Sequence, residues 1–176
     1  MKLQGELATA MNSQVTLEHH SALAYEQLAY DMEAIDLPGI AGWFRAQAEE
    51  ERVHAAKFAQ HMLDRDARPQ LEQIDAMTET ANDVLSAFEA SLAQEERVSD
   101  AIRNLYRIAN EQGDVDSLPL LHWFINEQLE EESSVAEIIG RVKLIGDDGS
   151  GLLKLDQELG SRPGGANPAE AADTAE

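Results

Sequence analysis

The chain has 176 residues and no cysteine, and its 13 Lys and Arg against 34 Asp and Glu give a formal net charge of −21. This length suits one domain with a substantial core. The negative charge argues against a nucleic-acid partner, because phosphates would be repelled. The lack of cysteine excludes disulfides, iron–sulfur clusters and thiol chemistry.

The first half of the chain predicts two long helices. Apolar residues recur at steps of three and four over residues 4–34 and again over 38–64, and a short turn joins the two segments. Each stripe is interrupted near its middle by polar residues, Glu18 in the first and Glu51 with His54 in the second. Because this spacing places residues on one helix face, these side chains are expected on the face that a helix normally buries.

The second half repeats the pattern. Residues 80–111 and 117–145 predict two more helices around a short turn, with Glu95 and Glu131 in the middle of their stripes. The phase of the third stripe favours Glu95 over its neighbour Glu96. Because a short turn joins the two helices of each half, each half is expected to form an antiparallel pair.

The segment between the halves lacks helical periodicity from Arg65 to about Glu79. Some 15 residues at ~3.3 Å each can run the ~40 Å length of such a helix. The second and third helices are therefore expected to be parallel, which gives an all-α four-helix bundle with one long crossover. A short fifth helix is expected at 152–159, so we predict a domain at 1–159 and a disordered acidic tail at 160–176.

The four carboxylates share one further property. A residue at mid-helix sits at the same height whether its helix runs up or down, so Glu18, Glu51, Glu95 and Glu131 should meet in one buried layer. Buried unpaired carboxylates are very unfavourable, and a pair of metal ions is the simplest source of positive charge. Carboxylates with one imidazole suit iron or manganese.

Other polar residues allow two interpretations. Tyr25 lies two turns beyond Glu18 and is either a core tyrosine or a redox-active neighbour of the metals, while the amide of Gln128 faces the same layer. Three further acids flank the stripes and are either a third cation site or a solvated acidic face: Glu50, Glu127 and Glu130.

Four segments carry a family resemblance: Leu17-Glu18-His19-His20-Ser21-Ala22-Leu23-Ala24-Tyr25, Glu50-Glu51-Arg52-Val53-His54, Gln94-Glu95-Glu96, and His122 through Glu131. With them the chain resembles the non-haem bacterial ferritins from about Leu7 to Leu159. The resemblance implies a ferritin-like fold and a di-iron ferroxidase site within each subunit. It also implies a hollow cage of 24 subunits that stores ferric mineral.

The same resemblance implies individual roles. Glu18 and His54 match the terminal ligands of one iron, and Glu51 the bridging ligand. Glu95 and Glu131 match the ligands of the second iron, with Gln128 beside it. Tyr25 matches the tyrosine near the centre, and the additional iron site of the family falls on Glu50, Glu127 and Glu130.

Departures from related families narrow this expectation. Haem-containing bacterioferritins carry a second Glu-x-x-His on the fourth helix, where this chain has Gln128 and Glu131, and their haem-ligand methionine falls on Arg52. We therefore expect no haem. The alternatives are a bacterioferritin-like cage, a di-iron oxidase of organic substrates without storage, and a bundle that metal ions merely stabilise.

The remaining expectations concern partners and location. The substrates are expected to be Fe(II) and dioxygen or hydrogen peroxide, and the main partner other copies of the chain. The start of the sequence lacks the apolar run of a signal peptide and no segment approaches membrane-spanning length, so the protein is expected in the cytoplasm with no membrane partner. No targeting address is recognisable in the tail.

Overall fold

The structure is a computed structural model that describes residues 2–77 and 80–161. These residues form five helices: α1 (Gly5–Ala34), α2 (Pro38–Asp64), α3 (Val84–Gln112), α4 (Leu118–Ile145) and α5 (Gly149–Gly160). The predicted four-helix bundle with a short fifth helix is confirmed. The predicted disordered tail lies outside the described residues from position 162 onward.

Two predicted helix starts were wrong by a few residues. α3 begins at Val84 and not at 80, because the Asp83 carboxylate accepts a hydrogen bond from the Ser86 N–H and the Ser86 hydroxyl caps the Asp83 backbone. α5 begins at Gly149 and not at 152, where Asp148 accepts from the Ser150 N–H. Such capping bonds satisfy the free N–H groups of a first helical turn and so fix where a helix begins.

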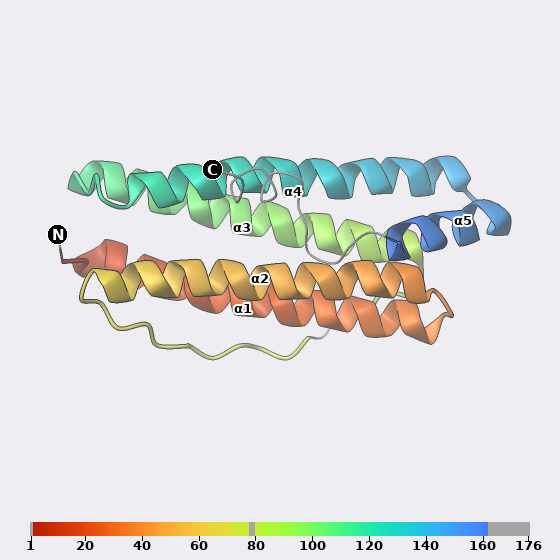
Figure 1. Cartoon of the computed structure of the whole chain (residues 1–176), viewed down its shortest axis with the longest axis horizontal. Coiled ribbons are helices and arrows are strands. Elements are labelled where there is room, and N and C mark those ends of the chain that lie inside the picture. The colour runs from red at the N-terminus through yellow and green to blue at the C-terminus, as the bar shows by residue number, and fades with distance from the viewer. Residues whose placement is uncertain (1, 78–79, 162–176) are drawn as a thin grey trace.

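The helices form two antiparallel pairs, α1 with α2 and α3 with α4, and α1 also packs against α3. The crossover runs along α1 from one end of the bundle to the other, so α2 and α3 point the same way (Figure 1). It is hydrogen-bonded to α1 near both ends: Asn12 Nδ2 donates to the Gln70 carbonyl at 2.8 Å, and the Ala81 N–H donates to Asp31 at 2.8 Å. The predicted parallel arrangement is therefore present.

The bundle interior contains two separate apolar clusters. One surrounds Phe44 and Phe88 near α5, and the other surrounds Phe58 and Phe124 near the opposite end. Between them lies a layer of buried polar side chains, which is described below. Each carboxylate of that layer is thus held on helices whose flanking turns are fixed by apolar packing.

α5 folds back onto the start of α2 (Figure 1). Leu155 and Leu159 are buried there, and Asp156 Oδ1 accepts a hydrogen bond from the Ile40 N–H at 2.8 Å. α2 has no side-chain cap of its own at Leu37, so α5 supplies that missing cap. Leu153, in contrast, stays exposed.

No helix in the described part of the chain has the length and apolar character needed to cross a lipid bilayer.

Candidate metal centre

The polar layer between the two apolar clusters consists of acids and one imidazole. The predicted central residues are all buried, with at most 4 % of any of them exposed: Glu18, Glu51, His54, Glu95, Gln128 and Glu131. They come from all four long helices, so the structure brings the predicted set into one interior region.

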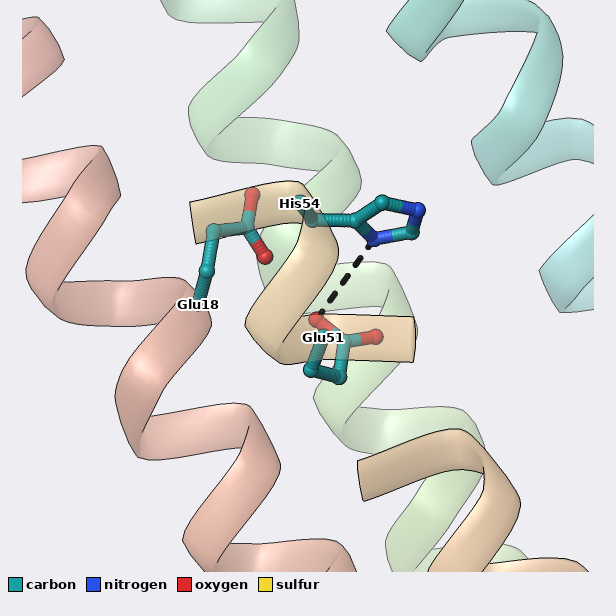
Figure 2. Close-up of side chains that lie close together, drawn as sticks. All are labelled: Glu18, Glu51 and His54. Atoms are coloured by element: carbon teal, nitrogen blue, oxygen red, sulfur yellow. Dashed lines mark ion pairs between the residues drawn. The ribbon is translucent and has the colours of Figure 1, made fainter. Parts of the chain in front are cut away.

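Glu18, Glu51 and His54 form one group of possible metal ligands (Figure 2). One ligand atom from each lies within 4.8 Å of the others, and His54 Nδ1 is 3.8 Å from Glu51 Oε2. Glu51 and His54 are three residues apart on α2 and so project from adjacent turns, while Glu18 faces them from α1. Three ligand atoms this close together could hold one divalent cation.

Several atoms of this group lack hydrogen bonds within the described part of the chain. They are both carboxylate oxygens of Glu51, both ring nitrogens of His54 and Glu18 Oε2. Buried polar atoms are nearly always satisfied, and leaving one unmet costs roughly 1–3 kcal/mol. A bound cation would satisfy these atoms together, so the donor set fits iron.

The pKa shifts of the central acids also indicate a cation site. Burial raises the pKa of Glu18 well above its ordinary value, and the charge of Glu51 raises it further. Burial likewise raises the pKa of Glu51 and of Glu131, each of which is also near Glu95. These shifts express the free-energy cost of several negative charges in one dry interior, a cost that cations relieve.

Glu95 is held by two neighbours. The Tyr25 hydroxyl donates to Glu95 Oε1 and is 3.0 Å from Ser91 Oγ, and Gln128 Nε2 donates to Glu95 Oε2 at 3.0 Å. Burial and then the charge of Glu95 raise the pKa of Tyr25 well above 10. Both Tyr25 and Gln128 therefore contact the predicted centre through Glu95.

Two glutamines complete the layer, and no role was predicted for either. Gln14 Nε2 donates to Glu18 Oε1 at 2.8 Å, and Gln47 Nε2 donates to Glu131 Oε2 at 3.0 Å. Each stands in its stripe four residues before a central glutamate, Gln14 before Glu18 and Gln47 before Glu51. Their place in the stripes is the signal that could have found them, because it puts both side chains on the helix faces that carry the central glutamates.

The three flanking acids differ in their burial. Glu50 and Glu127 are buried, and their carboxylates lie within 4.8 Å of each other and of a ring nitrogen of His54. Glu130 is exposed and belongs to neither of the ligand groups found among the described residues. The solvated-face interpretation therefore describes Glu130 but not the other two.

Aromatic rings pack around His54. Trp123 and Phe124 both meet its ring edge-on, with centroids at 5.7 and 5.4 Å. Lys57 Nζ lies 3.4 Å from the centre of the Trp123 ring. This packing restricts the orientation of the imidazole.

Comparisons with known proteins agree on one family. Residues 8–145 match the family Ferritin, described as a ferritin-like domain. The chain is 34 % identical over 160 residues to bacterial non-heme ferritin of Staphylococcus aureus (strain USA300), which covers 91 % of this chain and 96 % of that protein. Bacterial non-heme ferritin of Staphylococcus epidermidis matches with the same identity and coverage.

Solved structures give the same result. A structure described as a novel open pore ferritin from the hyperthermophilic archaeon Archaeoglobus fulgidus superposes with a TM-score of 0.89 at 32 % identity. The match covers 92 % of this chain and 100 % of that one. A humanized archaeal ferritin superposes equally well, at 33 % identity.

Proposed function

The chain belongs to the ferritin family, and from that premise we propose that it oxidises Fe(II) with dioxygen at the buried carboxylate layer and stores the Fe(III) product as a mineral inside a cage of 24 copies. Iron storage is the function that family membership supports. The oxidation site, its residues and the size of the cage are the finer parts of the proposal.

One observation carries the proposed site. Glu51 and His54 are fully buried side by side, and neither has a hydrogen bond on any side-chain ligand atom within the described residues. We assign Glu18 and His54 to one iron, Glu95 and Glu131 to the other, and Glu51 to both. The four carboxylates, when ionised, balance the four positive charges of two ferrous ions.

The reaction needs little from the protein beyond position and charge. Two ferrous ions give up one electron each, and one dioxygen takes up both electrons and two protons to leave as hydrogen peroxide. The carboxylates favour the ferric product, because oxidation adds positive charge beside them. Tyr25 and Gln128 fix the rotamer of Glu95, and Gln14 and Gln47 do the same for Glu18 and Glu131.

Rapid mixing of metal-free protein with ferrous iron in air tests the site. Glu51→Ala removes the shared ligand and should lower the initial oxidation rate at least about 100-fold, the upper end of the loss seen when only an outer partner of a ligand is removed. Glu49→Ala is the matched control, since Glu49 lies on the same helix but is exposed and pairs with Arg52 at 2.6 Å. A wild-type rate in Glu51→Ala would refute the site.

Assembly is tested separately. A chain of 19.3 kDa should sediment as a particle of many hundreds of kilodaltons. Large apolar side chains remain exposed on α4 and α5, among them Leu144 and Leu153, and contacts between subunits would cover them. A stable monomer or dimer at micromolar concentration would exclude the cage.

Haem is not part of the proposal. The Arg52 guanidinium is paired with Glu26 at 2.7 Å and with Glu49, so this position holds a surface ion pair and offers no axial ligand. Purified protein should show no Soret band. A stoichiometric haem signal would favour the bacterioferritin-like alternative.

A cavity gives the oxidase alternative one specific point of support. It has a volume of about 310 Å³ between α1, α3 and the crossover, and Tyr25, Ser91 and Arg97 are among its lining residues. The described residues that line it include none of the proposed iron ligands, so Tyr25 separates it from the centre. Storage is the better-supported function, and turnover of added organic compounds with loss of dioxygen would reverse that ranking.

A further inference from the structure

The cavity of about 310 Å³ beside the crossover lies where the crossover is longer than the distance it covers. On either side of this stretch the crossover is attached to α1: the Glu72 N–H donates to Thr16 Oγ1 at 3.1 Å, and the Ala81 N–H donates to Asp31 at 2.8 Å. Thr16 and Asp31 lie ~22 Å apart along the axis of α1, whereas the chain from Glu72 to Ala81 can extend over ~30 Å. The extra length leaves room for a cavity between the crossover, α1 and α3.

The inner wall of this cavity offers mainly apolar surface. Tyr25 and Leu28 of α1 are buried there, and Met77 of the crossover is half-buried. The Tyr25 hydroxyl is already bonded to Glu95 and to Ser91 Oγ, so its ring and not its oxygen is available to a ligand. A molecule in the cavity would therefore place an apolar part against this wall.

The mouth of the cavity carries two opposite charges, Arg97 from α3 and Asp75 from the crossover, and both residues are exposed. They do not pair with each other. Within the described part of the chain, the Arg97 guanidinium makes no hydrogen bond or ion pair, and the Asp75 carboxylate accepts one hydrogen bond, from Gln73 Nε2 at 3.0 Å. Both charged groups therefore remain available at the mouth.

His20 lies near both of these charges. Burial lowers the pKa of His20, the charge of Arg97 lowers it further, and the charge of Asp75 raises it. His20 also lines the cavity and is neutral at pH 7, so it adds no charge of its own. The mouth thus presents one positive and one negative group on either side of a neutral ring.

We propose that this cavity binds a free α-amino acid with a large apolar side chain, such as phenylalanine. The ligand carboxylate would meet Arg97, its ammonium group would meet Asp75, and its side chain would lie against the inner wall. The cavity has room for about ten water molecules at ~30 Å³ each, which is close to the number of non-hydrogen atoms in such an amino acid.

A zwitterion suits this mouth better than a simple anion or cation. An anion would meet Arg97 but would be repelled by Asp75 and by the net charge of −21. A cation would meet Asp75 but would be repelled by Arg97. An amino acid has a partner for each group and no net charge.

Binding at this cavity does not depend on the proposed function. Tyr25 and Ser91 close its inner end, and none of the proposed iron ligands is among the described residues that line it. The amino acid is therefore bound without reaching the carboxylate layer, and metal-free protein is the material for the test.

Equilibrium dialysis of the metal-free full chain with radiolabelled phenylalanine measures the affinity. We expect one site per chain, with a dissociation constant on the order of 1 mM for a ligand of this size with few polar contacts. 3-Phenylpropionate lacks the ammonium group and phenethylamine lacks the carboxylate, so each should bind about fivefold more weakly, the upper end of what an exposed ion pair contributes. Glycine should bind at least about tenfold more weakly, because it has no side chain to bury.

Substitutions at the mouth assign the two ends of the ligand. Arg97→Gln should weaken phenylalanine binding about fivefold without weakening phenethylamine, and Asp75→Asn should do the same without weakening 3-phenylpropionate. Arg103→Gln is the matched control on α3, since Arg103 does not line the cavity and pairs with Asp100 at 3.1 Å. Ala24→Leu, which fills the cavity without changing a charge, should abolish binding.

Three results would overturn the proposal. The first is no saturable binding of phenylalanine at concentrations about 20-fold above the expected constant. The second is 3-phenylpropionate or phenethylamine binding more tightly than phenylalanine, which would make the cavity a site for simple anions or cations. The third is wild-type affinity for phenylalanine in Ala24→Leu or in both charge variants, which would place the bound amino acid elsewhere on the protein.

Discussion

Two clusters of charged residues in the bundle differ in how their negative charge is neutralised. At one end, Arg65 donates to both carboxylate oxygens of Asp114 at 2.8 and 2.6 Å and to Ser117 Oγ at 2.7 Å. In the middle, Glu18, Glu51 and His54 lie together, and the charges that act most on the two glutamates belong to other glutamates and to His54. The hydrogen bond from Arg65 lowers the pKa of Asp114 to about 2, whereas burial raises the pKa of the central acids.

The difference separates a structural cluster from a binding site. A buried acid whose cation belongs to the protein stabilises the fold and has no ligand atom left to offer. A buried acid without such a cation destabilises the fold until an ion arrives, and that cost favours binding. Four predictions test this contrast, from the largest expected effect to the smallest.

Arg65→Ala should destabilise the protein most, by about 3 kcal/mol, because it leaves the Asp114 carboxylate, whose side chain is only 12 % exposed, without its cation. Urea unfolding of metal-free protein measures the loss. Arg45→Ala is the control, since Arg45 and its partner Glu33 are both about half exposed (48 % and 52 %), and such pairs contribute roughly 0–1 kcal/mol. Equal losses of stability in Arg65→Ala and Arg45→Ala would contradict the distinction between the Arg65 cluster and an ordinary exposed ion pair.

Acid should affect the two clusters in opposite directions. The pKa of Asp114 is about 2 in the fold and 3.8 in the unfolded chain, so its stabilisation is complete above pH 3.8 and is lost as the pH falls towards 2. The central acids have raised pKa values, so their destabilisation grows as the pH rises above about 4.5. Thermal melts of metal-free protein should therefore improve from pH 7 to pH 5.

The predicted loss of stability at low pH has its own control. Asp114→Asn should lower the melting temperature at pH 5 and make it less sensitive to acid below pH 4. If Asp114→Asn is as sensitive to acid as the wild type, groups other than Asp114 cause the loss of stability at low pH.

Removing a central charge should stabilise metal-free protein. Glu51→Gln keeps the size of the side chain and removes one buried negative charge, so we expect a gain of about 1 kcal/mol, the low end of the cost of a buried unsatisfied group. Saturating zinc should reverse the order and make the wild type more stable, by mass action. A loss of stability in metal-free Glu51→Gln would contradict the view that these acids are held at a cost.

The smallest expected effect concerns Asp156, whose carboxylate accepts a hydrogen bond from a backbone N–H. Asp156→Ala removes the bond to the Ile40 N–H and should cost about 1 kcal/mol, the usual loss for a helix cap. Asp147→Ala, at an exposed acid in the turn before α5, is the comparison and should cost less than half as much. No change in Asp156→Ala would mean that α5 docks through its leucines only.

Helical periodicity was enough to predict most of the fold. It placed all four long helices, their directions and the crossover, because each stripe had to face one common interior. It also distinguished Glu95, which is fully buried, from Glu96, which is exposed. The starts of α3 and α5 were not predictable from it, since they depend on single capping bonds at Asp83 and Asp148.

The site was less accessible to the same reasoning. Residues at the centre of a stripe are buried whatever their neighbours do, but those at its edge depend on how helices cross. Glu127 and Glu130 both flank the stripe of α4, and only the first is buried. The position of His54 between two acidic groups needs side-chain rotamers, which no pattern of spacing contains.

The contact between α5 and α2 predicts how substitutions will be tolerated along one helix. A side chain at Gly39 would place its first carbon 1.9 Å from the Asp156 carbonyl oxygen, because the two backbones touch there, and one at Gly160 would lie 2.7 Å from the Gly39 Cα. Gly42, three residues further along α2, has nothing within 4 Å of that position. Within one chain, alanine at Gly42 should be accepted and even favour the helix, by up to about 1 kcal/mol. Any side chain at Gly39 would displace α5 and remove the cap from the helix that carries Glu51 and His54.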